Sequence, residues 1–186
     1  IEIENAHYPE IRLFKVRTDF KALPEQDCGG NWVVCSPKTA PNFSALAYFF
    51  ARQIFIQKKI PIGLVVSSVG GSSCQAWTSR ETLSNDSLLY KKYLFPYDTS
   101  RQSKEQIDSV VTFEKVVRPT VFYNAMIYPL RNLNFTGSLW YQGESNRYDS
   151  SLYTQLCSKM IYNWRNLFKD QQLPFYFVIL LREIFG

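Results

Sequence analysis

The sequence predicts an α/β fold, a three-layer α/β/α sandwich with a mainly parallel sheet. Predicted elements alternate as strand, helix, strand, helix, strand, helix, strand, which is the order typical of parallel-sheet proteins. The predicted strand at 62–69 is a nearly continuous apolar run, the predicted strand at 135–141 is apolar and aromatic, and each leads directly into a polar or glycine-rich loop. Open α/β sheets bind ligands at the carboxyl ends of such strands, so we expect the two loops to form one polar pocket.

Length and composition predict one globular domain spanning residues 1–186. The chain is 46% hydrophobic and 20% charged, which suits a sizeable core. The longest apolar run, at 175–181, is too short to span a bilayer and predicts a buried strand, so we expect no membrane partner. The opening residues read as the middle of a domain, and we expect the natural protein to begin earlier.

Charge and cysteine spacing argue against two classes of partner. The net charge is +5, but the basic residues are scattered and Lys58-Lys59 and Lys91-Lys92 are the only lysine doublets, so no nucleic acid is expected. With four cysteines, no CxxC pair and one histidine, neither a metal nor a cofactor is expected. Cys28 and Cys35 flank a glycine turn and form either a small-loop disulfide or two free thiols.

The first half of the chain contains two predicted strands joined by a loop and a helix. Ile11 to Val16 is a short strand candidate, and residues 18–41 are expected to be irregular and anchored by Trp32. A mostly buried helix follows, with Asn42 as its possible N-cap and Lys58-Lys59 at its end.

The second half is predicted to be mainly helical. Thr78 or Ser79 could cap a short helix beginning at Arg80, and residues 84–117 are expected to form a helical or loop excursion, a possible lid. Residues 120–131 form a helical segment broken by Pro129. The clearest helix follows the cap Asp149-Ser150-Ser151. Its apolar stripe consists of Tyr153, Leu156, Met160, Trp164, Leu167 and Phe168.

Two short stretches contain the candidate chemistry. Gly70-Gly71 exposes backbone N–H groups, although a simple tight turn is the alternative interpretation. Gln142-Gly143-Glu144-Ser145-Asn146 places two amides and a carboxylate on one side of an extended loop, with a capped loop before the next helix as the alternative.

No nucleophile–base pair can be assembled from these residues. The single histidine, His7, precedes the first strand and reads as a surface or packing residue. Ser72 and Ser145 are therefore candidate nucleophiles only in isolation, and neither lies in a G-x-S-x-G turn.

Five segments together resemble the sialate O-acetylesterase family, within the SGNH or GDSL-type esterases. They cover most of the chain in the family's order, and WYQGESN with an upstream YNAMIYPL is the most specific match. The matching segments are YPEIRLF (8–14), WVVCSPKTAPNFSALAYFFAR (32–52), IPIGLVVSSVGGSSCQAW (60–77), RPTVFYNAMIYPLRNLNFTGSLWYQGESN (118–146) and YNWRNLF with LPFYFV (162–178).

The resemblance implies roles for particular residues. Gly71, or Gly70 as the alternate, would supply a backbone oxyanion donor. Gln142 or Asn146 would supply a second donor from its side chain, and Glu144 would hold the loop or contact the catalytic histidine. Trp77 and Arg118 are candidates for the substrate rim, with core or surface packing as the alternative.

The resemblance also implies an activity and what this chain lacks for it. The family removes acetyl esters from carbohydrates through a serine acyl-enzyme, here from sialic acid of the 9-O-acetyl type. Its GQSN-like nucleophile block and its DxxH block are absent from these residues, so the chain alone is expected to be an inactive fragment. A non-catalytic carbohydrate-binding relative and an acetylxylan esterase are the alternatives.

Further expectations follow from the same resemblance. The protein would be secreted, periplasmic or lysosomal, and the sequons at Asn42, Asn85 and Asn134 agree weakly with glycosylation. Residues 179–183 depart from the family, which has a glutamine and then a proline after this strand.

Overall fold

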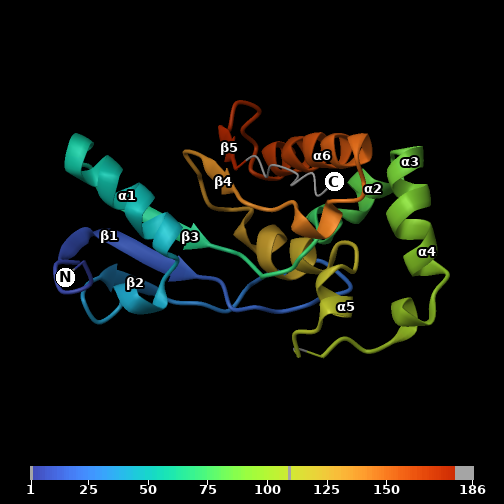
Figure 1. The fold of residues 1–186 in the computed structure, drawn as a ribbon, viewed down its shortest axis with the longest axis horizontal. Helices are drawn as coiled ribbons and strands as arrows, with labels where there is room; N and C mark the ends of the chain where they lie inside the picture. The colour runs from blue at the N-terminus through green and yellow to red at the C-terminus, as the bar shows by residue number, and fades with distance from the viewer. Residues whose placement is uncertain (1, 109, 179–186) are drawn as a thin grey trace, which may run out of the picture. The chain divides into compact units, whose positions relative to one another are not determined.

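The chain folds into two compact units in the computed structural model, which describes residues 2–108 and 110–178 (Figure 1). The first unit contains the residues up to Thr18 together with Cys28–Ser68. The second contains Asp19–Asp27 and the residues from Val69 onward. The α/β class is confirmed, although both sheets are small. The assignment of residues 1–186 to one domain stays a prediction.

The first unit is built on a three-stranded sheet of order β2-β1-β3. Its central strand β1 (Tyr8–Lys15) pairs in parallel with β3 (Ile62–Val66) and antiparallel with β2 (Trp32–Cys35). Alternate residues of β1 point to the core, where Ile11 and Leu13 are completely buried. Tyr48 and Ala51 from the helix α1 (Ala45–Lys58) join the same core cluster, so α1 packs against this face of the sheet.

Strand β2 corrects the expectation that residues 18–41 are irregular throughout. This four-residue strand pairs with β1 at the edge of the sheet, and Trp32 packs its ring 5.2 Å from that of Phe14 while remaining 45% exposed. Val33 and Val34 are exposed as well. Such a short edge strand between glycine and proline residues depends on its partner strand, and the local sequence indicates it weakly.

Helix α1 begins three residues later than its predicted cap. Asn42 lies in a preceding 3-10 turn (Ala40–Asn42), and the N-cap is Ser44, whose hydroxyl accepts a hydrogen bond from the Ala47 N–H at 3.3 Å. The helix ends as expected, with Lys59 in the left-handed conformation. The expectation that α1 is mostly buried is wrong, because two of its aromatic side chains, Phe49 and Phe50, are 50% and 42% exposed.

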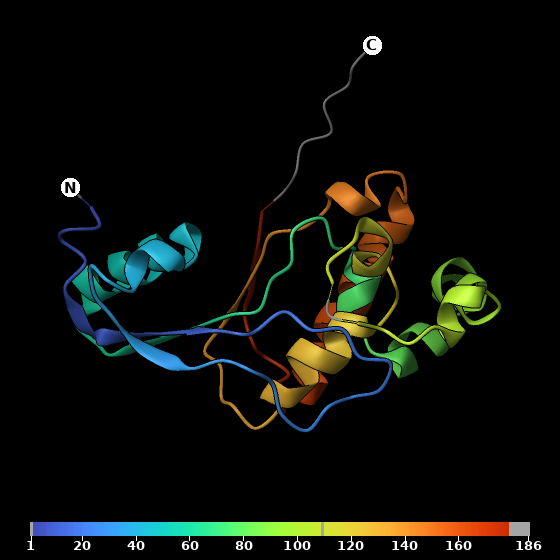
Figure 2. The ribbon, with the colours of Figure 1, turned by 90° about the horizontal axis from the view of Figure 1, so that it is seen from below.

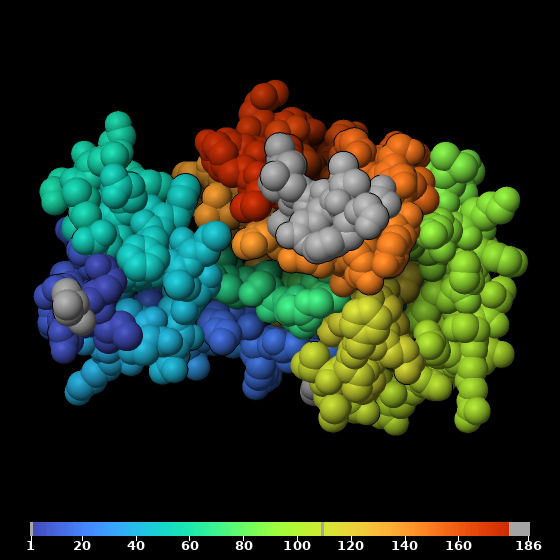
Figure 3. Space-filling view, viewed as in Figure 1, coloured from blue at the N-terminus to red at the C-terminus, as the bar shows by residue number. Residues whose placement is uncertain are grey.

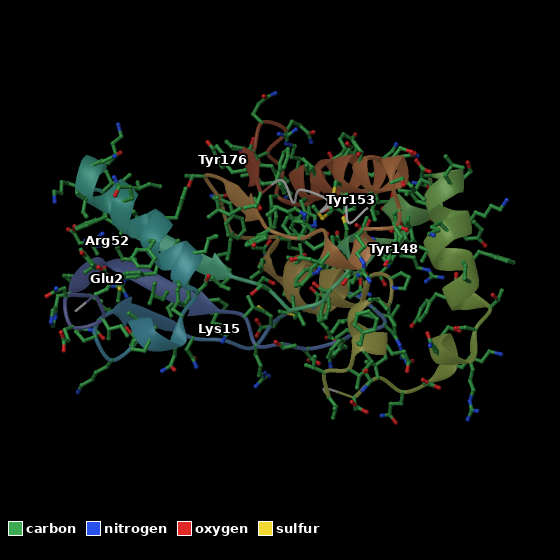
Figure 4. All side chains as sticks on the ribbon, in the orientation of Figure 1. Glu2, Lys15, Arg52, Tyr148, Tyr153 and Tyr176 are labelled. Carbon is green, nitrogen blue, oxygen red and sulfur yellow. The ribbon has the colours of Figure 1, made fainter. Side chains whose placement is uncertain are left out.

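The N-terminal segment is tied to α1 by charge. Figure 4 labels Glu2 and Arg52 close together, and the Arg52 Nε lies 3.1 Å from a Glu2 carboxylate oxygen. The Tyr48 hydroxyl donates to the same oxygen at 2.8 Å. These partly exposed contacts stabilise the segment before β1 only modestly.

The second unit contains a parallel pair of strands joined by the longest helix. Strands β4 (Ser138–Trp140) and β5 (Phe175–Phe177) pair in register, and α6 (Ser151–Leu167) connects them. Strand β4 is shorter and more exposed than the buried strand predicted at 135–141. In β5, Tyr176 and Phe177 are exposed, which differs from the buried strand predicted at 175–181, and residues 179–183 lie outside the described residues. Likewise β3 stops at Val66, three residues before the expected end.

Helix α6 carries the predicted apolar stripe. Leu156, Met160 and Trp164 are buried, and the Trp164 indole N–H donates to the Trp77 carbonyl at 2.9 Å. Figures 1 and 2 show α6 running beside the segment around α2 (Arg80–Ser84). The predicted side-chain cap is wrong, because Ser150 occupies the N-cap position without a capping hydrogen bond.

The remaining segments of the second unit are short helices and turns. Ser79 caps α2 as predicted, accepting from the Thr82 N–H at 3.1 Å. Residues 84–117 are largely helical where they are described, and residues 121–127 are all buried. The bounds in these regions are α3 (Ser87–Leu89), a π-turn (Tyr90–Leu94), α4 (Phe95–Asp98), a 3-10 turn (Arg101–Lys104), α5 (Phe113–Val116), a second π-turn (Tyr123–Ile127) and a 3-10 turn containing Pro129 (Tyr128–Leu130).

Within residues 2–108 and 110–178, none of the helices combines the length and the apolar character needed to cross a lipid bilayer.

The capping assignment predicts a difference between two substitutions. Ser44→Ala removes the acceptor for the Ala47 N–H and should lower the free energy of unfolding of the first unit by about 1 kcal/mol. Asn42→Ala removes no capping bond and should change it by less than about 0.5 kcal/mol. Urea unfolding followed by circular dichroism measures both. An equal or larger loss for Asn42→Ala would contradict the assignment.

Candidate functional site

The turn at Gly70-Gly71 opens the candidate site, which lies entirely within the second unit. Gly71 has a φ of +74°, in the left-handed region that favours glycine, and a Cβ added there would meet nothing within 4 Å. Both glycines are exposed, and neither N–H has a hydrogen-bond partner among the described residues. The turn therefore presents free backbone donors next to open space.

The second stretch runs from the end of β4 into a 3-10 turn (Glu144–Asn146). Gln142 and Asn146 are buried, with 8% and 3% of their surface exposed, whereas Glu144 is exposed. The extended loop predicted at 142–146 is thus a tight turn, and its two amide side chains point into the protein.

Hydrogen bonds join the two stretches directly, over about seventy residues of sequence. The Ser145 hydroxyl donates to the Gly71 carbonyl at 2.6 Å, and the Gln142 Nε2 donates to the Ser72 carbonyl at 3.0 Å. The Cys74 N–H donates to the Asn146 Oδ1 at 2.8 Å. The structure therefore brings together the glycine turn and the amide-bearing loop, as the sequence predicts.

The amide hydrogens of both side chains already have partners. Each carboxamide has two N–H donors. Those of Gln142 reach the Ser72 carbonyl and, at 2.9 Å, the Asn146 Oδ1. Those of Asn146 reach the Gln75 Oε1 at 2.9 Å and an Asp149 carboxylate oxygen at 2.8 Å. In this arrangement the amides brace the site, and the glycine N–H groups remain the open donors.

Two tyrosines support this amide network from neighbouring helical segments. The Tyr153 hydroxyl lies 2.8 Å from the Gln142 carbonyl and 3.0 Å from its Oε1, and Figure 4 labels Tyr153 in the first turn of α6. The Tyr93 hydroxyl donates to Asp149 at 2.8 Å. Burial raises the pKa of both tyrosines, and the hydrogen bond to Asp149 raises that of Tyr93 further, so both remain neutral donors.

The side chains outside this network lie at the surface. The Glu144 carboxylate has no hydrogen bond or ion pair with any described residue, so Gln142, Ser145 and Asn146 hold the loop instead. Beside it, Arg147 is exposed, and its guanidinium lies 4.4 Å from the ring centre of Tyr148. In Figure 3 the orange segment containing these residues lies next to the green helices of the excursion, which agrees with the 3.3 Å ion pair between Lys92 and Asp149.

Trp77 and Arg118, the two candidates for the substrate rim, are buried. Trp77 is 2% exposed, stacks on Phe122 with ring centres 4.7 Å apart, and donates from its indole N–H to the Ser72 hydroxyl. Arg118 is 4% exposed and pairs with Glu105 at 3.0 Å and Glu114 at 2.6 Å. Arg118 also borders a cavity of about 440 Å³ that is lined mostly by residues of the excursion. Their roles at a rim stay predictions.

The hydroxyls of both candidate serines already donate to backbone carbonyls. Ser72 donates to the Val69 carbonyl at 2.8 Å and Ser145 to that of Gly71, while His7 belongs to the first unit. Among the described residues no cluster of three histidine, cysteine or carboxylate side chains could hold a metal ion.

Several supporting residues were not assigned to the site from the sequence. Gln75, Tyr93 and Tyr153 contact the amide network although they come from three separate segments. The sequence indicates Tyr153 and Asp149 only as part of the α6 stripe and its cap. A buried loop rich in amides needs buried partners, but nothing local indicates which distant residues provide them.

Comparison with known proteins shows the family of this chain. A family model described as "Carbohydrate esterase, sialic acid-specific acetylesterase" matches residues 35–184, more than half of the chain. The chain belongs to this family. The match includes both the glycine turn and the amide-bearing loop, and it confirms the resemblance to the sialate O-acetylesterases.

Individual relatives are similar over nearly the whole chain. Sialate O-acetylesterases from Mus musculus and Rattus norvegicus are 33% and 31% identical to it, each over 95% of this chain. The crystal structure of a carbohydrate acetylesterase from Xanthomonas citri superposes with a TM-score of 0.75 at 31% identity, again over 95% of this chain. The chain spans only 38% of the length of the rodent relatives and 35% of that bacterial chain.

The hydrogen-bond network predicts that Asn146 matters far more to stability than its exposed neighbour. Asn146→Ala leaves the buried Cys74 N–H and Gln75 Oε1 without their partner and should destabilise the fold by about 3 kcal/mol. Glu144→Gln, which changes an exposed side chain, should cost less than about 0.5 kcal/mol. Denaturant titration of both variants measures the difference, and equal effects would contradict the proposed bracing.

Proposed function

We propose that this chain forms the oxyanion-binding side of a carbohydrate O-acetylesterase that removes acetyl groups from sialic acid of the 9-O-acetyl type. The observation that carries the proposal is the free, exposed N–H of Gly71 beside a rigid amide network, in a chain of this family. A tetrahedral intermediate of ester hydrolysis carries one negative oxygen, and pre-positioned N–H donors stabilise it.

The mechanism assigns separate roles to the glycine and to the amides. In the proposed reaction a serine attacks the acetyl carbonyl, the alcohol of the sugar leaves, and water then hydrolyses the acyl-enzyme. Gly71 N–H donates to the oxyanion in both steps, with Gly70 as the alternate. A second donor from Gln142 or Asn146 requires one amide hydrogen to leave its present acceptor when substrate binds.

The nucleophile and the base are proposed to lie outside these 186 residues. The proposal is supported by the donor bonds of Ser72 and Ser145, and by the absence of GQSN and DxxH blocks from the sequence. Removing one oxyanion donor from an enzyme costs about 3 kcal/mol of barrier, so donors without a nucleophile give little catalysis.

Activity measurements test this division of roles. The 186-residue chain should not hydrolyse p-nitrophenyl acetate above background, whereas a longer polypeptide of the same gene that includes both missing blocks should release acetate from O-acetylated sialic acid. Hydrolysis by the short chain that is lost in Ser145→Ala would contradict the assignment.

A matched glycine pair tests the oxyanion turn within the active polypeptide. Gly71→Ala forces a side chain into a left-handed conformation at a cost of about 1 kcal/mol, so the turn should rearrange and kcat should fall. Gly70→Ala meets open space without that constraint and should have a smaller effect. Equal losses in the two variants would argue against Gly71 as the donor.

The exposed side chain of Arg147 favours sialic acid over acetylated xylan, the substrate of one of the alternatives. Its exposed guanidinium follows Asn146 directly and is held by the Glu144 carbonyl at 3.1 Å and by the Tyr148 ring. No carboxylate among the described residues pairs with it. A sialic acid carries a carboxylate that this group can pair with, whereas xylose units are neutral.

Substrate selectivity measures the contribution of Arg147. In the active polypeptide, Arg147→Gln should lower kcat/KM about tenfold for O-acetylated sialic acid, which corresponds to about 1.4 kcal/mol. The same variant should leave hydrolysis of acetylated xylan unchanged, and Arg147→Lys should retain part of the preference. A parallel loss on both substrates would indicate a structural role instead.

The other candidate function is a carbohydrate-binding relative without catalysis. A complete reading frame that lacks a GQSN block upstream and a DxxH block downstream would favour it. The proposed location is the secretory pathway, as for the family.

A further inference from the structure

Two cysteines that are distant in sequence lie in contact behind the amide network. The Cys74 and Cys157 sulfurs are 3.7 Å apart, although the residues are separated by 83 positions. Cys74 is completely buried and Cys157 is half-buried, and both lie in the second unit. Neither sulfur is in a disulfide in the structure, and the same holds for Cys28 and Cys35.

The surroundings hold the two sulfurs in place. Cys74 begins the 3-10 turn Cys74–Trp77, and its sulfur also lies 3.7 Å from the Met160 sulfur on α6. Cys157 lies on the same helix, three residues before Met160. A disulfide requires the sulfurs to approach to about 2.05 Å, so the proposed bond requires a further approach from the present contact distance.

We propose that Cys74 and Cys157 form a disulfide by exchange with a small disulfide oxidant such as oxidised glutathione. The Cys157 thiolate attacks one glutathione sulfur, forming a mixed disulfide and releasing one glutathione thiolate. The Cys74 thiol then attacks the Cys157 sulfur, and its proton passes to the departing glutathione thiolate, which releases the second glutathione as a thiol. Two protein thiols are oxidised and one glutathione disulfide is reduced to two thiols.

The acidity of the two thiols supports this order of attack. Hydrogen bonding from Cys74, with a further contribution from Tyr153, lowers the pKa of Cys157, while burial raises the pKa of Cys74 well above its usual value. Cys157 is also the more accessible of the two. It is therefore the thiol that an external disulfide meets first.

The crosslink would join the two supports of the candidate site. The Cys74 backbone N–H holds the Asn146 side chain, and Tyr153, one helical turn before Cys157, holds Gln142. A covalent bond between these supports would keep both amides in place when the surrounding helices fluctuate. It would also close a long loop, which restricts the unfolded chain.

Mass spectrometry of the 186-residue chain tests the proposal without relying on esterase activity. The folded chain is incubated with oxidised glutathione, its remaining thiols are alkylated under denaturing conditions, and the non-reduced digest is mapped. We expect a peptide pair that joins Cys74 to Cys157 and separates on reduction. The melting temperature should rise by about 5 °C and return to its initial value with dithiothreitol.

Serine substitutions separate this pair from the other two cysteines. Cys157→Ser should abolish the crosslinked peptide and the redox-dependent shift in melting temperature, whereas Cys28→Ser should preserve both. The proposal is overturned if Cys74 and Cys157 stay alkylatable after oxidation, if glutathione remains on Cys157 without closure, or if only Cys28 and Cys35 become linked. Because wild-type protein gives the primary result, misfolding of a variant leaves the test intact.

Discussion

The side chain of Asn146 is the constraint on which the candidate site depends. One carboxamide accepts from the Cys74 N–H and from Gln142, and donates to Gln75 and Asp149. Only 3% of the Asn146 surface is exposed, and its side chain forms one hydrogen bond with each of four neighbours, so its own buried polar atoms have partners as well. Polar atoms left without partners in such an environment are costly, so these hydrogen bonds define one arrangement of the loop around the turn.

The amide network and the glycine turn have complementary properties. The amides are buried and fully bonded, whereas the Gly71 N–H is exposed and free of partners among the described residues. A donor that is held still but left unbonded is suited to a charge that appears only during a reaction. The left-handed φ of Gly71 makes this possible, because a residue with a side chain would resist the same turn.

Three differences between expectation and structure each have a physical cause that the local sequence does not show. Apolar runs indicate that a strand exists, but a strand ends where its pairing ends, so β3 and β4 are both shorter than predicted. The N-cap of α1 is Ser44 and not the predicted Asn42, because a 3-10 turn that contains Asn42 precedes the helix. Trp77 and Arg118 are polar-tipped residues near the motifs, yet stacking on Phe122 and pairing with two glutamates bury them.

The sequence by itself determined the α/β class, the apolar stripe of α6, the Ser79 cap and the two segments that meet at the site, because each of these is encoded in local periodicity or in a contiguous motif. Only the tertiary structure decided which atoms of those segments contact one another. These contacts include the hydrogen bonds of both amide side chains and the contact between Cys74 and Cys157. Partners seventy or more residues apart leave no trace in local patterns, because their contact arises only when the helices and turns pack together.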